Sequence, residues 1–175
     1  TFSPSRLFLY YCERDEEGTV KIDAGASLRD GCKVMHKIGI CQEEFWPYDI
    51  DKFAERPPDQ CFKNANHHKT LEYRRVEQDC DSILASLQEG YPVIFGFNVY
   101  ESFESFEVEL TGIVPLPDVE EKLLGGHAVA IVGICKQKKM FLVRNSWGKS
   151  WGIKSPAKHM GHCWMPFDYI LNPDL

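Results

Sequence analysis

Two short stretches in the second half of the chain decide the fold: GGHAVAIVG at residues 125–133 and NSWGKSWG at residues 145–152. The apolar residues of the first stretch run on to Cys135, and a second apolar run leads from Met140 into the second stretch. Only a short lysine-rich segment separates the two runs, which is typical of a turn between paired strands. The sequence therefore predicts an antiparallel hairpin that places the two stretches side by side.

A histidine and an asparagine stand on adjacent strands of this hairpin, where their side chains can meet. An uncharged oxygen from Asn145 can orient the imidazole of His127 and fix which tautomer is available, and Trp147 can cover the contact. The free ring nitrogen can then exchange a proton with a thiol, because a nearby imidazolium favours the thiolate. This Cys-His-Asn logic makes His127 and Asn145 candidate catalytic residues, with Trp147 in support.

The rest of the chain is helical first and β-rich afterwards, which predicts an α+β protein. Helices are expected where capping residues precede apolar residues at helical spacing, and strands where apolar or β-branched residues run or alternate. The expected helices are residues 3–14, with Ser3 as the cap, 27–38 after Ser27, 59–67, and 79–90 after Asp79. The expected strands are residues 70–76, 93–99, 111–114, 127–135 and 140–145.

The order of these features resembles the papain-like cysteine peptidases. The two opening stretches look like the second half of such a peptidase, and the match extends back through residues 25–27, 38–40, Tyr48 and residues 90–93. The resemblance implies a two-lobe fold, with a helical left lobe over residues 1–90 and an antiparallel β right lobe over residues 91–175. Together these would form one incomplete papain-like peptidase domain, with substrate extended in the cleft between the lobes.

The resemblance also implies roles for individual residues. His127 would be the general base and acid, Asn145 its orienter, and Trp147 the shield of their hydrogen bond. In addition, Gly25 and Ala26 align with the glycine pair that meets the substrate backbone, and Gly126 would face the scissile bond. The implied partner is a protein or peptide substrate, and no cofactor is implied.

One departure from the family pattern concerns the nucleophile. Papain-like cysteine peptidases carry the nucleophilic cysteine on a long N-terminal helix, in a Gly-x-Cys-Trp motif preceded by Gln. This chain contains no such motif. Cys135 lies at the far end of the His127 strand, roughly 25 Å away at ~3.3 Å per residue, and cannot substitute. The nucleophile is therefore expected on an upstream segment or a separate chain, which can be an N-terminal fragment of the same precursor.

Two other interpretations stay open. The chain can be a catalytically inert papain-fold module that binds a peptide or protein partner, although such a module has no physical need for the trio of His127, Asn145 and Trp147. It can also be a different enzyme that uses the same groups, such as an acyltransferase, but related thiol acyltransferases usually orient the histidine with an aspartate, so Asn145 disfavours them.

Composition excludes several function classes. The 175 residues carry a formal net charge of −6, so neither nucleic acid nor an anionic membrane is an expected partner. No apolar stretch approaches the ~18 residues that span a bilayer. The odd number of cysteines, seven, leans weakly towards a reducing, intracellular compartment. His159, His162 and Cys163 lack a fourth ligand, so an ordinary loop is expected there and no metal.

Overall fold

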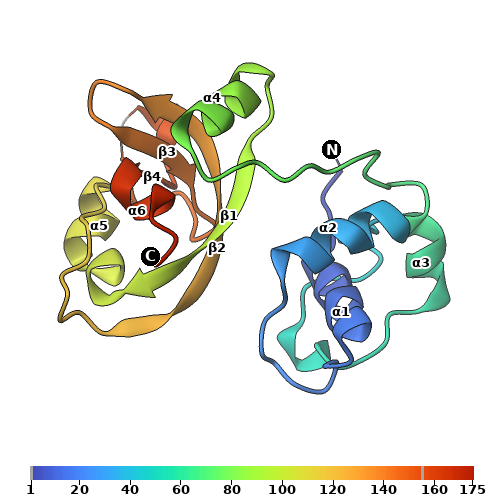
Figure 1. The fold of residues 1–175 in the computed structure, drawn as a ribbon. Helices are drawn as coiled ribbons and strands as arrows, with labels where there is room; N and C mark the ends of the chain where they lie inside the picture. Colours follow the sequence, from blue (N-terminus) through green and yellow to red (C-terminus); the bar gives the residue numbers. More distant parts are fainter. Residues whose placement is uncertain (1, 155) are drawn as a thin grey trace. The chain divides into compact units, whose positions relative to one another are not determined.

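The computed structural model describes residues 2–154 and 156–175, and its internal contacts divide the chain into two units (Figure 1). The first unit ends at Arg74 and the second begins at Arg75, earlier than the expected boundary between residues 90 and 91. The helix α4 (Cys80–Gln88) belongs to the second unit because its Ile83 is buried in the core beneath that unit's sheet. The mixture of helices with an antiparallel sheet confirms the predicted α+β class.

The first unit is helical. Its elements are α1 (Arg6–Glu17), α2 (Leu28–Lys37), the short 3₁₀ helix η1 (Ile50–Lys52) and α3 (Asp59–Ala65). Ser27 caps α2 as expected, because its hydroxyl accepts the backbone N–H of Arg29. The cap of α1 is Ser5, whose hydroxyl accepts the N–H of Phe8, so the predicted cap at Ser3 was wrong by two residues.

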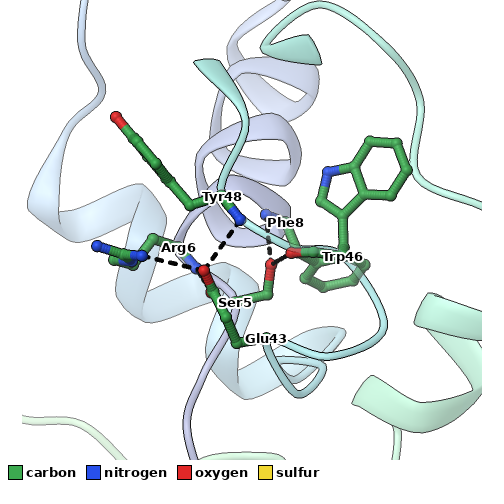
Figure 2. A network of polar contacts seen from close by, with 6 residues as sticks. All are labelled: Ser5, Arg6, Phe8, Glu43, Trp46 and Tyr48. Atoms are coloured by element: carbon green, nitrogen blue, oxygen red, sulfur yellow. Dashed lines mark hydrogen bonds and ion pairs between the residues drawn. The ribbon is translucent and has the colours of Figure 1, made fainter. Parts of the chain in front are cut away.

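A compact polar network fixes the start of α1 against the loop that follows α2 (Figure 2). The Ser5 hydroxyl that caps the helix also donates to the carbonyl of Trp46 at 2.6 Å. The Glu43 carboxylate accepts the backbone N–H groups of Arg6 and Tyr48 and the Arg6 guanidinium. Two groups at the helix N-terminus thereby hold the loop over residues 43–48 in one conformation.

The core of the first unit lies between its helices and contains an arginine. Its buried apolar residues are Phe8, Tyr11, Cys12, Val34, Cys41, Cys61 and Ala65. Beside them the Arg14 side chain is fully buried and donates hydrogen bonds to the carbonyls of Tyr10, Val20 and Phe53. Its guanidinium also lies 3.8 Å from the Tyr10 ring centroid. These contacts compensate the burial of the charge and tie α1 to the loops that follow it.

The second unit is built on one antiparallel sheet with the strand order β1-β2-β3-β4 (Figure 1). The strands are β1 (Val93–Tyr100), β2 (Leu123–Cys135), β3 (Met140–Arg144) and β4 (His162–Pro166). The remaining elements besides α4 are η2 (Glu101–Glu104), α5 (Phe106–Thr111), η3 (Ala157–His159) and α6 (Phe167–Leu171). The predicted hairpin is confirmed as β2 and β3, which pair from Cys135 and Met140 outward.

Two predicted strands are wrong. Residues 70–76 form no strand: they alternate in sequence, but residues 71–75 are exposed where the units divide, and no strand that the structure describes pairs with them. Residues 111–114 contribute one isolated bridge, from Ile113 to Trp164, because Gly112 adopts a left-handed conformation that ends α5 there. The strand β2 also begins earlier than expected, at Leu123.

The sheet buries one face against the helices of its own unit. Alternate residues of β1 and β2, namely Phe97, Val99, Val129 and Ile131, point into this core. The hydroxyl of Tyr169 on α6 donates to the carbonyl of Asn98, which ties the end of the chain to the sheet. Within the residues described here, no helix is long and apolar enough to cross a membrane.

Candidate active site

The side chains of His127 and Asn145 meet at the edge of the sheet in the second unit. The pairing of Ala130 with Arg144 places Asn145, the next residue, beside the position of Val129. His127 is two residues from Val129, so its side chain projects from the same face of the strand. The imidazole Nε2 and the Asn145 Oδ1 lie 2.8 Å apart, as the hairpin predicts.

The hydrogen bonds around Asn145 define the tautomer of the imidazole. Asn145 Oδ1 also accepts the backbone N–H of Ser146 at 2.7 Å, which identifies this atom as the amide oxygen. An oxygen acceptor requires a proton on Nε2 of His127. In the neutral ring the other nitrogen, Nδ1, is therefore the proton acceptor. Asn145 is itself buried, at 8% exposure, so its amide is held in place.

Aromatic rings enclose the histidine. The Trp147 indole stacks on the imidazole with ring centroids 5.0 Å apart and an interplanar angle of 26°. Phe97, the cross-strand neighbour of His127, and the fully buried Phe103 lie with their centroids 6.0 and 6.4 Å from it. The tryptophan thus covers the ring as expected. Phe103 was not predicted, because nothing in its own sequence segment links it to the hairpin.

A hollow of about 140 Å³ opens beside the imidazole. It is lined by Val99, Glu104, Leu124, Gly125, Gly126, His127 and Trp147. Gly126 therefore borders the space next to His127. Sequence reasoning missed Val99, Glu104 and Leu124, which reach the hollow from three separate segments.

The two other predicted substrate-binding residues, Gly25 and Ala26, belong to the first unit. They lie in the exposed loop before α2, and Gly25 adopts a positive φ of 79° that suits glycine. The backbone N–H of Gly25 donates to the Tyr10 hydroxyl at 3.1 Å, and that hydroxyl lies 2.5 Å from an Asp23 carboxylate oxygen. The loop is thus fixed by α1, and its role towards substrate stays a prediction.

The cysteines of the chain are placed for structure rather than for attack. All seven are free thiols. Burial raises the pKa of Cys12, Cys41 and Cys163 to about 12, so these thiols stay protonated. Cys135 is the last residue of β2, eight residues after His127, and Cys80 is the first residue of α4. None of them adjoins the imidazole in the hollow.

The histidines near the end of the chain do not gather into a metal centre. The rings of His159 and His162 have centroids 6.1 Å apart, and His162 Nδ1 lies 3.1 Å from the carbonyl oxygen of Met160. Cys163 is fully buried in the core. Among the residues that the structure describes, no group of three or more His, Cys, Asp or Glu side chains could hold a metal ion.

An α+β fold with an asparagine-oriented histidine beneath a tryptophan defines a protein of the papain-like cysteine peptidase class. Residues 5–160 match the papain family of cysteine proteases, and the chain belongs to this family. The structure is similar to that of xylellain, a cysteine protease from Xylella fastidiosa, with a TM-score of 0.88 and 43% identity. That similarity covers 99% of this chain and 67% of xylellain.

Curated relatives agree with this assignment. An uncharacterized peptidase C1-like protein of Acanthamoeba polyphaga mimivirus is 40% identical over 183 residues, which covers 100% of this chain and 57% of the relative. Cathepsin B-like cysteine proteinase 3 of Ostertagia ostertagi is 30% identical over 118 residues, covering 66% of this chain and 64% of that proteinase. The chain therefore spans roughly three fifths of the length of these two relatives.

Proposed function

We propose that this chain is part of a cysteine endopeptidase that hydrolyses peptide bonds by a Cys-His-Asn mechanism, with the nucleophilic thiol contributed by a segment outside residues 1–175. That segment would be an upstream part of the same precursor or a separate chain. The observation that carries the proposal is the oriented imidazole: Nε2 of His127 is engaged by Asn145, which leaves Nδ1 to take up a proton. The seven cysteines of the chain lie away from that nitrogen or are buried.

In this mechanism the incoming thiol gives its proton to Nδ1 of His127, and the thiolate attacks the carbonyl carbon of the peptide bond. The imidazolium then protonates the leaving amine as the C–N bond breaks. In the second half, the imidazole takes a proton from water, and the resulting hydroxide releases the acyl group from sulfur. Asn145 keeps the ring oriented throughout, and the oxyanion donors would come from the segment that bears the thiol.

The substrate would be a protein or an extended peptide. Gly126 borders the space beside His127, where the scissile bond would lie. Gly25 and Ala26 lie in an exposed loop of the first unit, and they would meet the backbone of an extended peptide. No cofactor takes part in this chemistry, since every proton is exchanged among the thiol, the imidazole, the leaving amine and water.

The decisive experiment compares the 175-residue chain with the same chain supplied with the thiol-bearing segment. We expect no hydrolysis of a fluorogenic peptide by the chain alone, and hydrolysis that iodoacetamide abolishes when the segment is present. In the complete protein, His127→Ala should abolish turnover, whereas His67→Ala is a matched control because His67 is exposed in the first unit.

Two outcomes would contradict the proposal. Hydrolysis by the chain alone would mean that one of its own residues is the nucleophile. A complete protein that binds peptides but leaves them intact would instead favour the alternative, a catalytically inert papain-fold module that binds a peptide or protein partner.

A further inference from the structure

The hollow beside His127 carries one negative charge. Apart from the imidazole of His127, its other walls are apolar or backbone: Val99, Leu124 and Trp147 supply hydrocarbon and an indole face, and two glycines supply main chain. Glu104 is the single acidic residue in the lining. Among the residues described, no lysine, arginine or histidine lies close enough to Glu104 to form an ion pair with it. Its carboxylate is therefore available to a ligand.

Glu104 is the last residue of η2, and the two residues before it are held by the contacts of the second unit. The preceding residue, Phe103, is fully buried, and its ring packs against Trp147 and Trp151 at centroid distances of 5.5 and 5.6 Å. The N–H of Ser102 donates to the Glu121 carboxylate at 2.9 Å. The backbone before Glu104 is thus packed against the same tryptophan that covers His127, and Glu104 lines the hollow together with the imidazole.

We propose that Glu104 gives this hollow a preference for lysine or arginine at the substrate residue that follows the scissile bond. This inference rests on the proposed function, in which His127 protonates the leaving amine. The residue that begins with that amine must lie against the imidazole, and the hollow is the space that the imidazole borders. A lysine or arginine stem packs on Leu124 and Trp147, and its charge reaches the carboxylate.

The hollow also limits the size of the selected group. A volume of about 140 Å³ accommodates a single side chain. An acidic residue at this position would bring a second carboxylate close to Glu104, which is unfavourable. A neutral chain of the same length keeps the apolar contacts and loses only the ion pair. The charge preference and the apolar preference can therefore be measured separately.

The test uses the complete protein and internally quenched peptides that differ only after the scissile bond, where they carry lysine, norleucine or glutamate. We expect kcat/KM for the lysine peptide to exceed that for norleucine by about threefold, the size of a partly exposed ion pair. In Glu104→Gln this ratio should fall to about one, and Glu104→Lys should favour the glutamate peptide. Glu107→Gln is the matched control, because Glu107 is exposed on α5 and does not line the hollow.

Two additional readouts separate this inference from the proposed function. A peptide with an aminomethylcoumarin leaving group has no side chain for the hollow, so Glu104→Gln should hydrolyse it at the parent rate. In a protein without any turnover, a peptide beginning with lysine should still shift the NMR signal of the Trp147 indole N–H, and Glu104→Gln should weaken that binding. A lysine-to-norleucine ratio that Glu104→Gln leaves unchanged, or equal binding of both peptides, would overturn the inference.

Discussion

The orientation of one imidazole depends on a single side-chain oxygen. Asn145 Oδ1 accepts both the His127 ring N–H and the Ser146 backbone N–H, so substitution of Asn145 by alanine frees the ring to rotate. In the complete protein we expect Asn145→Ala to lower kcat/KM by at least about tenfold, the equivalent of one hydrogen bond. Steady-state hydrolysis of a fluorogenic peptide measures this, with retention of thermal stability as the control for folding. Unchanged kinetics would show that Asn145 does not act through His127.

Tyr10 plays a comparable positioning role in the first unit. Its hydroxyl accepts the Gly25 N–H and faces the Asp23 carboxylate, and burial together with Asp23 raises the pKa of this phenol, which keeps its proton available as a donor. Tyr10→Phe removes both contacts without changing the ring that stacks on Arg14. Hydrogen exchange at the Gly25 amide should therefore accelerate by roughly tenfold. Tyr11→Phe is the control, and equal exchange in both variants would argue against the role of Tyr10.

At the scale of elements, the contact between α1 and α2 contains a partly buried carboxyl group. Glu13 on α1 lies so close to Gly31 on α2 that a Cβ at residue 31 would clash with the Glu13 carboxylate. Burial, reinforced by the charges of Glu17 and Asp30, raises the pKa of Glu13 from 4.5 to about 7. The folded state therefore favours the protonated form, and the stability that this form contributes is lost as pH rises from about 4.5 through about 7.

This linkage gives a prediction for unfolding. Glu13→Gln should make the free energy of unfolding less dependent on pH, with a gain over the parent of about 2 kcal/mol at pH 8, allowing for partial exposure, and little gain at pH 4.5. Urea unfolding at both pH values measures the difference. Glu16→Gln, a change at an exposed carboxylate in the same helix, should show no such difference. An equal gain at both pH values would refute the titration of Glu13 as the cause.

The elements that the sequence predicted correctly are those specified by local signals. Ser27 and Asp79 cap their helices as expected. The β2–β3 hairpin brings His127 and Asn145 together because His127 lies in β2 and Asn145 directly follows β3. The strand β4 was missed because it has only five residues. It pairs with the outer edge of β3, and the periodicity of a sequence does not reveal which strand it pairs with. Glu104 was missed for the same reason, since only tertiary structure brings η2 to the histidine.

At the scale of the whole molecule, the junction between the two units is the segment most exposed to proteases. Near the end of the first unit, the backbone N–H of Thr70 donates to the carbonyl oxygen of Met35. In the second unit, the side-chain amide of Gln78 donates to the carbonyl oxygen of Ile170. Between these anchors, residues 71–75 are exposed and belong to no helix or strand. A protease needs such an extended, unpaired stretch in order to bind the backbone.

Limited digestion with trypsin should therefore cut first after Arg74 or Arg75 and release fragments that correspond to the two units. The lysines of the β2–β3 turn compete poorly, because Lys139 N–H bonds to the Lys136 carbonyl and cleavage there requires local opening of the hairpin. Mass spectrometry of the early fragments identifies the site, and the double variant Arg74→Gln/Arg75→Gln should lose the first cut while later ones persist. Early fragments that end at Lys136 or Lys139 would instead place the least protected backbone in the hairpin, within the sheet that carries His127.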